Sequence, residues 1–217
     1  MKVVVAVLTY NRMDLFKRTI GSLKRTRVPY TRIVVDNAST DGTTALVEEM
    51  HGICNRTGNH HTGMGYRLAM EAAVAHSPEL IVFSGDDFEF REGWLEKLVA
   101  FWEAAPACVA ICGMYIEALY AHCPVKGVVE FGGQRALLRG TLPGASWSYR
   151  PWVWEKIKDL VKDDSMYYDK AAGQRLVGEA YLLAQLPLSE HTGAGRRMWR
   201  AGPEDPGMPV DRKKWRI

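Results

Sequence analysis

The sequence contains no apolar run of membrane-spanning length. Across its 217 residues, Asp, Glu, Arg or Gly interrupts the apolar stretches every few positions, whereas a transmembrane helix needs about 20 consecutive apolar residues. The first segment reaches Thr9 and Tyr10 after a short apolar run and lacks the small-residue cleavage signature of a signal peptide. We therefore expect one domain without a membrane span, located in the cytoplasm.

Cysteine is scarce, and no two cysteines have the C-x-x-C spacing of a zinc or redox motif. Most of them lie in apolar surroundings, so reduced core cysteines are expected instead of disulfides or a zinc site. This expectation agrees with a reducing compartment. The four cysteines are Cys54, Cys108, Cys112 and Cys123.

Charge of one sign is not in large excess, because the formal net charge is +3. This value is too small to indicate nucleic-acid binding by itself. The C-terminal end is strongly basic, however, and phosphate contacts through it leave a nucleic acid open as a partner. The basic residues of this C-terminal end are Arg196, Arg197, Arg200, Arg212, Lys213, Lys214 and Arg216.

Strand-like and helix-like patterns alternate through the first half of the chain. Continuous apolar runs are typical of strands covered on both faces, and apolar residues at helical spacing follow each run. This alternation predicts an α/β fold with a Rossmann-like, mostly parallel sheet and helices on both faces. The expected strands are residues 3–8, 33–35, 80–83 and 108–112, and the expected helices are 13–23, 46–50, 63–76 and 94–102.

The pattern changes from Met114 onward to short mixed runs, turn glycines and a cluster of aromatic residues. A helix is expected through Val153, Ile157 and Leu160, and another from Asp169 to Gln185. The aromatic cluster has two open interpretations, a packed core or an exposed stacking wall. Its members are Trp147, Tyr149, Trp152 and Trp154.

Polar residues follow three of the expected strands. Ligands of an open parallel sheet bind beyond the carboxyl ends of its strands, so these residues are expected to meet at one binding site. They are Thr9, Tyr10 and Asn11 after the first strand, Asp36 and Asn37 after the second, and Asp86 and Asp87 after residues 80–83.

Two adjacent carboxylates, Asp86 and Asp87, repel each other unless a cation or hydrogen-bond donors compensate the charge. Mg²⁺ or Mn²⁺ favours oxygen ligands and keeps open positions for substrate phosphates. The alternative is a pair of solvated turn aspartates that cap the helix before Trp94. The pair alone leaves both interpretations open.

Three segments in order, TYNRMDLFKRTIGSL, RIVVDNASTDGT and LIVFSGDDFEFREGWLEKL, resemble the glycosyltransferase family 2 enzymes, whose fold is called GT-A. GASWSYRPWVWEKI, SMYYDKAAGQRLVGEAY and LSEHTGAG resemble the acceptor-side segment, the base-bearing helix and the late histidine of that family. The similarity touches most of residues 3–195. It implies a metal-dependent, inverting glycosyltransferase that moves a sugar from a nucleotide-sugar donor to a hydroxyl acceptor.

The resemblance implies that Thr9, Tyr10 and Asp36 hold the nucleoside of the donor. The Asp36 carboxylate would accept a hydrogen bond from an imide N–H, which points to a UDP- or dTDP-sugar. A turn carboxylate satisfied by its neighbours is the alternative for Asp36. Arg67 would meet a phosphate, or it is a surface arginine of its helix.

For the metal, the resemblance implies Mn²⁺ or Mg²⁺ bound by Asp87, with His191 in the metal or phosphate shell. Asp86 would contact the ribose or a bound water. A satisfied loop histidine is the alternative for His191. Family members often have D-x-D here, and this sequence has Gly85 at the first position.

For the catalytic base, the resemblance implies Asp169 at the start of its helix, with Asp163 and Asp164 as rivals. Arg196 and Arg197 would stabilise the leaving diphosphate, or they are plain surface charge. One domain is expected over residues 1–200, with a nucleotide-binding half at 1–113, an acceptor half at 114–200 and a peripheral basic tail at 201–217.

Three other functions stay open at this stage. A sugar-phosphate nucleotidyltransferase can share the fold but normally has a glycine-rich loop after the first strand, where this chain has TYNR and no glycine before Gly21. A catalytically silent nucleotide-sugar-binding module has the same binding residues. The third is the same transfer chemistry on a base of DNA or RNA.

Overall fold

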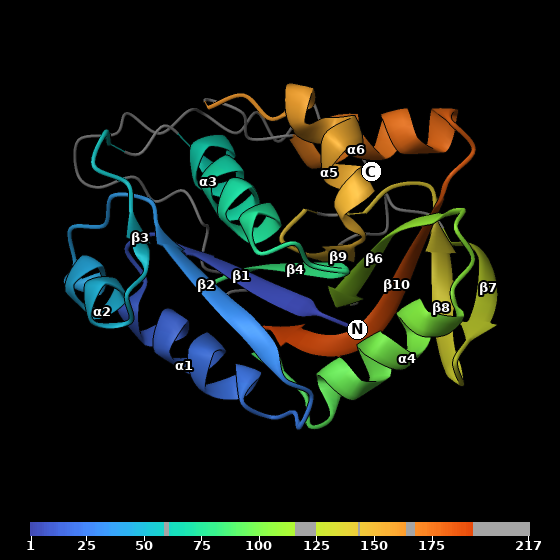
Figure 1. Ribbon diagram of the computed structural model, residues 1–217, viewed down its shortest axis with the longest axis horizontal. Coiled ribbons are helices and arrows are strands. Elements are labelled where there is room, and N and C mark those ends of the chain that lie inside the picture. Colours follow the sequence, from blue (N-terminus) through green and yellow to red (C-terminus); the bar gives the residue numbers. More distant parts are fainter. Residues whose placement is uncertain (59–60, 116–124, 143, 164–167, 193–217) are drawn as a thin grey trace, which may run out of the picture.

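The computed structural model describes residues 1–58, 61–115, 125–142, 144–163 and 168–192. Their strands join into one ten-stranded sheet, and helices cover both of its faces (Figure 1). No helix in these ranges has the length and apolar character needed to cross a bilayer. The basic tail at 201–217 lies outside the described residues.

The first part of the sheet is parallel and confirms the expected β-α-β alternation. Its strands lie in the order β3-β2-β1-β4, so the order reverses between β1 and β4. The elements are β1 (Val3–Thr9), α1 (Met13–Leu23), β2 (Tyr30–Asp36), α2 (Thr43–Glu49), β3 (Ile53–Cys54), α3 (Thr62–Ala75) and β4 (Leu80–Gly85).

Every residue of β1 is buried, because successive side chains point to opposite faces of the sheet and each face carries its own core. Val3, Val5 and Val7 pack into a cluster with residues of α1 and α4 (Trp94–Ala104). Val4, Ala6 and Leu8 pack into a second cluster with α3. A continuous apolar strand is therefore what this two-sided packing requires.

The second part of the sheet mixes parallel and antiparallel strands. It continues from β4 in the order β9-β6-β10-β8-β7, and β9 is antiparallel to both of its neighbours. The remaining elements are β5 (Phe88–Phe90), β6 (Val109–Tyr115), β7 (Val125–Phe131), β8 (Gln134–Arg139), β9 (Ser146–Tyr149), α5 (Pro151–Ile157), the 3-10 helix η2 (Lys158–Leu160), α6 (Tyr168–Gly178) and β10 (Leu182–His191).

The expected helix from Asp169 to Gln185 is wrong in its second half. Helix α6 ends at Gly178, Ala180 has a left-handed φ of 64°, and the chain turns back into β10. Leu, Ala and Gln in this segment are good helix formers, but β10 is held between β6 and β8 and buries most of its side chains. Tertiary packing here overrides the local preference of the sequence.

The core interpretation holds for the aromatic cluster at Trp147, Tyr149 and Trp154. All three are buried in the cluster on the α3 face, so they do not form an exposed stacking wall. Trp152 is half-buried and packs against Tyr181.

The described cysteines are free thiols, as expected. Cys112 lies in the core and Cys54 is half-buried, but Cys108 is exposed, so the expectation of a core position is wrong there. Cys108 precedes β6 at a turn, where its thiol is not enclosed by the sheet. Cys123 lies outside the described residues.

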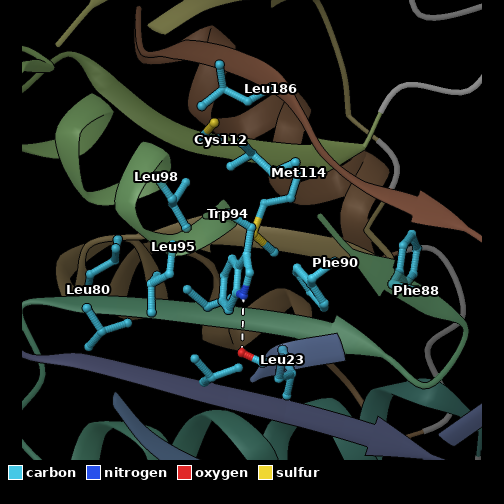
Figure 2. Close-up of a cluster of buried hydrophobic side chains, with 14 of the residues drawn as sticks. Leu23, Leu80, Phe88, Phe90, Trp94, Leu95, Leu98, Cys112, Met114 and Leu186 are labelled. Carbon is cyan, nitrogen blue, oxygen red and sulfur yellow. Dashed lines mark hydrogen bonds between the residues drawn. The ribbon is translucent and has the colours of Figure 1, made fainter. Parts of the chain in front are cut away.

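The core on the α1 and α4 face is centred on Trp94 (Figure 2). Its indole lies among Leu95, Leu98 and Met114, and its Nε1 donates a hydrogen bond to the carbonyl oxygen of Leu23 at 3.3 Å. Since Leu23 is the last residue of α1, this bond joins the two helices that cover this face of the sheet.

Candidate active site

The reversal of strand order between β1 and β4 brings two of the expected polar groups together. The Thr9 hydroxyl donates a hydrogen bond of 2.9 Å to Asp86 Oδ2, and the backbone N–H of Tyr10 donates one of 3.2 Å to the same oxygen. Such a reversal is where open α/β sheets bind ligands. The carboxyl ends of β1 and β4 therefore form the candidate site.

Asp86 is almost fully buried at this edge. Burial raises its pKa to about 7, the neighbouring Asp87 carboxylate acts in the same direction, and Arg12 and Thr9 oppose the rise. The Asp86 carboxyl is therefore much easier to protonate than an ordinary aspartate, which makes it a hydrogen-bonding group more than a fixed negative charge.

Asp87 is fully buried, yet it keeps its negative charge. Burial alone would raise the pKa of Asp87, but hydrogen bonds and charge from His191 and Arg12 lower it below the ordinary value. Arg12 Nη1 lies 2.6 Å from Asp87 Oδ2, and His191 Nε2 lies 3.1 Å from the same oxygen. The imidazole of His191 also stacks on the Phe88 ring at 4.9 Å.

Two threonines fix the backbone on either side of Asp87. The Thr19 hydroxyl, on α1, donates to the carbonyl oxygen of Asp86 at 2.8 Å and accepts from the Phe88 N–H at 3.2 Å. Thr192 donates to the Asp87 carbonyl oxygen through its N–H at 2.8 Å and its hydroxyl at 3.0 Å. The backbone at Asp87 is thus held from both sides.

One oxygen of this carboxylate, Asp87 Oδ1, is buried and has no hydrogen-bond partner. An unpaired buried carboxylate oxygen is costly, and a divalent cation would satisfy it. A Cβ built at Gly85 would lie 3.3 Å from this oxygen, so glycine keeps side-chain atoms away from it. The Asp87 carboxylate therefore fits the type of oxygen ligand that Mn²⁺ or Mg²⁺ uses.

No group of three His, Cys, Asp or Glu side chains in the described ranges is arranged to hold a metal. Protein ligands alone therefore do not enclose an ion at Asp87. Mg²⁺ and similar ions are commonly bound by one or two carboxylates together with the phosphates of a substrate. The site accordingly fits a cation that arrives with a diphosphate.

Asp36 lies on the same edge of the sheet, because it pairs with Thr9 in the β1–β2 register. Its carboxylate accepts from the Ser39 N–H, from the Ser39 hydroxyl and from the Thr44 hydroxyl. The Ser39 amide contact agrees with the alternative of a satisfied turn carboxylate. A carboxylate accepts about four hydrogen bonds and Asp36 is fully buried, so a further donor would have to displace one of these contacts.

Arg67 lies on α3 and forms an ion pair with Asp163. The pair links α3 to the segment before α6, and the Met64 N–H also donates to the Asp163 carbonyl oxygen. A phosphate would have to compete with Asp163 for this guanidinium. Asp163, one of the two rivals for the role of base, is therefore engaged by Arg67.

Asp169 is the second residue of α6, and the segment 144–145 links it to Gly85, the residue before the aspartate pair. Its Oδ2 accepts a hydrogen bond from the Gly144 N–H at 2.9 Å, and the next residue, Ala145, accepts from the Gly85 N–H at 2.8 Å. Burial raises the pKa of Asp169, although backbone hydrogen bonds from Gly144 and Lys170 oppose the rise. A raised pKa suits a general base that works near neutral pH.

Two residues of this site were not among the sequence candidates. Arg12 contacts both aspartates, with Nη1 3.5 Å from Asp86 Oδ1 in addition to its bond to Asp87. Gly144 holds Asp169. Arg12 directly follows the polar group after β1, but in the sequence it looks like a surface charge before a helix, and nothing local marks Gly144. Asp164, Arg196 and Arg197 lie outside the described residues.

Solved structures with a similar fold include a complex with UDP-GlcNAc and a mannosyltransferase in complex with GDP-Man and Mn²⁺. S. aureus TarS 1–349 has a TM-score of 0.67 and 20% identity, covering 89% of this chain and 61% of that chain. Its complex with UDP-GlcNAc has a TM-score of 0.62 and 19% identity, with coverage of 89% and 61%. The mannosyltransferase PcManGT from Pyrobaculum calidifontis, in complex with GDP-Man and Mn²⁺, has a TM-score of 0.61 and 20% identity, with coverage of 86% and 55%.

The chain therefore spans only about three fifths of the length of these proteins, and the similarity establishes the GT-A fold. No curated protein sequence matches the chain. The family model described as glycosyl transferase family 2 matches residues 4–119, more than half of the chain and including every residue from Thr9 to Asp87 discussed above. The chain belongs to glycosyl transferase family 2 and has the GT-A fold.

Proposed function

We propose that this glycosyltransferase is metal-dependent and moves a sugar, with inversion, from a UDP- or dTDP-sugar to a hydroxyl acceptor. The observation that supports it most is the fully buried Asp87 carboxylate at the strand reversal, whose Oδ1 has no partner. Asp87 would bind Mn²⁺ or Mg²⁺, with His191 beside it in the metal or phosphate shell. A divalent ion there supplies charge neutralisation for the departing diphosphate, an effect of several kcal/mol.

Residues 1–113 bind the donor in this proposal. Thr9 and Tyr10 line the nucleoside, Asp86 contacts the ribose or a water, and Asp36 accepts the imide N–H of the base in exchange for one of its present donors. Arg67 reaches a donor phosphate only by giving up Asp163. Complexes of similarly folded proteins with UDP-GlcNAc, and with GDP-Man and Mn²⁺, support a nucleotide sugar and a divalent ion in general.

Residues 114–200 face the acceptor in this proposal, and Asp169 acts as its base. The acceptor hydroxyl oxygen forms a bond to the anomeric carbon while its proton passes to an Asp169 carboxylate oxygen. The bond from that carbon to the diphosphate oxygen breaks, and the nucleoside diphosphate leaves with the electron pair. A positioned base of this kind contributes roughly 10² to 10⁴ in rate.

Calorimetric titration with UDP, dTDP and GDP, with and without Mn²⁺, tests the donor side. The wild type should bind UDP or dTDP only with Mn²⁺, and Asp87→Ala should lose this binding because it removes the buried ligand oxygen. Preference for GDP would contradict the role of Asp36. Binding of UDP that is unchanged by Mn²⁺ or by Asp87→Ala would contradict the metal site.

Donor turnover tests the catalytic side. Asp169→Asn should bind the donor as the wild type does but turn it over roughly 10² to 10⁴ times more slowly. Hydrolysis of a nucleotide sugar in Mn²⁺ without an added acceptor provides the readout. Wild-type turnover in the Asp169→Asn variant would assign the base elsewhere, and binding without any turnover by the wild type would favour a silent binding module.

A further inference from the structure

Arg12 is the only cationic side chain in the described ranges that contacts both aspartates of the site. Its Nη1 lies 2.6 Å from Asp87 Oδ2 and 3.5 Å from Asp86 Oδ1. The arginine side chain is 12% exposed and the Asp87 side chain 0% exposed. A charge-assisted hydrogen bond in such surroundings is much stronger than a surface ion pair.

The guanidinium thus neutralises part of the negative charge on Asp86 and Asp87, the same charge that the proposed metal would neutralise. A cation at Asp87 must share the carboxylate with Arg12, and two cations on one buried carboxylate repel each other because the low-dielectric surroundings screen them poorly. The bound metal and the Arg12–Asp87 contact therefore compete for the same negative charge.

The local structure lets Arg12 leave this position. Arg12 precedes the first residue of α1 with non-helical dihedral angles, φ −149° and ψ 49°. Among the described residues, its guanidinium contacts no group other than Asp86 and Asp87. Its backbone carbonyl, which accepts the Phe16 N–H at 2.9 Å, stays in the helix ladder when the side chain turns away.

We propose that Arg12 is an internal counter-cation that occupies the charge position of the divalent metal at Asp87, and that metal binding exchanges the guanidinium for the ion. This inference rests on the metal site of the proposed function. It makes Arg12 a positioning residue that keeps Asp87 ordered and charged while the metal is absent. Arg12 would also set the metal concentration that is needed to fill the site at Asp87.

The test is the affinity for Mn²⁺ alone, measured from the paramagnetic resonance of the free ion. Arg12→Met keeps the length of the side chain and removes its charge, so this variant should bind Mn²⁺ on the order of tenfold more tightly than the wild type. In EDTA it should melt roughly 5 °C lower, because the buried carboxylate loses its partner. A merely structural arginine would lower the melting temperature without tightening Mn²⁺ binding.

Arg12→Gln is a second variant that keeps a hydrogen-bond donor for Asp87 and so protects the fold, and it should also tighten Mn²⁺ binding. Arg18→Met is the matched control, because Arg18 lies on α1, the helix that Arg12 precedes, but pairs with Glu89 at the surface. Its Mn²⁺ affinity should equal that of the wild type.

Equal or weaker Mn²⁺ binding by both Arg12 variants, with normal binding by the wild type, would overturn the exchange while leaving the metal site in place. Mn²⁺ binding that persists in Asp87→Asn would instead overturn the metal site, and the exchange with it. Absence of Mn²⁺ binding in the wild type and in both Arg12 variants, even with UDP present, would also overturn both the metal site and the exchange.

Discussion

Asp86 and Asp87 are consecutive residues whose surroundings shift their pKa values in opposite directions. Asp86 meets hydroxyl and backbone donors and the more distant edge of Arg12, but burial and the Asp87 charge prevail and raise its pKa to about 7. Asp87 meets Arg12 and His191 as well, which lower its pKa despite burial. A pair arranged in this way carries one firm negative charge for a cation and one carboxyl that can accept or donate a hydrogen bond.

The raised pKa of Asp86 predicts a pH dependence of stability in EDTA. Between pH 3.8 and about 7 the folded protein holds a proton that the unfolded chain has lost, so the free energy of unfolding falls as pH rises through this range. One pKa unit corresponds to about 1.4 kcal/mol, which makes the total on the order of 4 kcal/mol.

Asp86→Asn should remove this decline, since the amide does not ionise and its oxygen can still accept from Thr9 and Tyr10. Urea unfolding of the wild type and the variant at several pH values between 4 and 8 provides the measurement. The variant should be similar to the wild type near pH 4 and more stable above pH 7. Parallel curves for the two proteins would show that Asp86 ionises normally.

Residue types next to strand ends predicted much of this site. Thr9, Asp36, Asp86 and Asp87 lie on one edge of the sheet because consecutive parallel strands place their carboxyl ends together. The roles assigned to these side chains remain predictions. Arg12 was not predicted, because a basic residue before an amphipathic helix is indistinguishable from a surface charge until the fold buries it.

At the scale of elements, one strand required information that lies far away in the sequence. The segment of β10 was expected to be helix because its Leu, Ala and Gln residues prefer helices, and its strand form depends on partners in β5, β6 and β8. The short strand β9 was not predicted either, because its strand form depends on its distant partners β4 and β6. By contrast, β1 and β4 were predicted because two-sided burial makes a strand continuously apolar.

Gly144, in the loop before β9, is predicted to keep Asp169 of α6 in position. A Cβ at Gly144 would lie 2.5 Å from the Asp169 Cβ, so Gly144→Ala must displace Asp169 or its own backbone. Donor turnover should fall about 10- to 100-fold with donor affinity unchanged, and overpacking should cost about 1–3 kcal/mol of stability. Turnover kinetics and UDP titration on the same protein separate the two effects.

Gly21→Ala is the matched control for this substitution. A Cβ at Gly21 meets no atom within 4 Å, and the residue lies inside α1. The control should keep full turnover and gain about 0.4–1 kcal/mol of stability from the lower entropy of the unfolded chain. A Gly144→Ala variant that behaves like Gly21→Ala would show that Asp169 does not depend on this glycine.

For the whole molecule, the sheet separates two cores, and contacts between the helices that cover each face contribute to the stability of that core. The layered α/β arrangement followed from the alternation of patterns along the first half. The insertion of β9 between β4 and β6 did not, because antiparallel pairing of such distant segments leaves no local pattern. Trp94 is the largest single side chain that ties α4 to α1 in the core of Figure 2.

Trp94→Phe should lower the free energy of unfolding by about 1–3 kcal/mol, since it removes the donor to the Leu23 carbonyl oxygen and leaves part of the indole volume unfilled. Urea unfolding followed by circular dichroism provides the measurement. Trp152→Phe is the control, because Trp152 is half-buried and should change stability much less. Equal losses for the two variants would show that the helix-to-helix bond contributes little.

The position of β10 in the sheet also has a consequence for synthesis on the ribosome. His191 meets Asp87 across 104 residues of sequence, and β5 finds its strand partner in β10. At a translation rate of about 5–20 residues per second, roughly 5–20 s pass between the emergence of the two residues. A nascent chain can thus finish its N-terminal parallel strands early, but it brings the imidazole to the carboxylate only after β10 has left the exit tunnel.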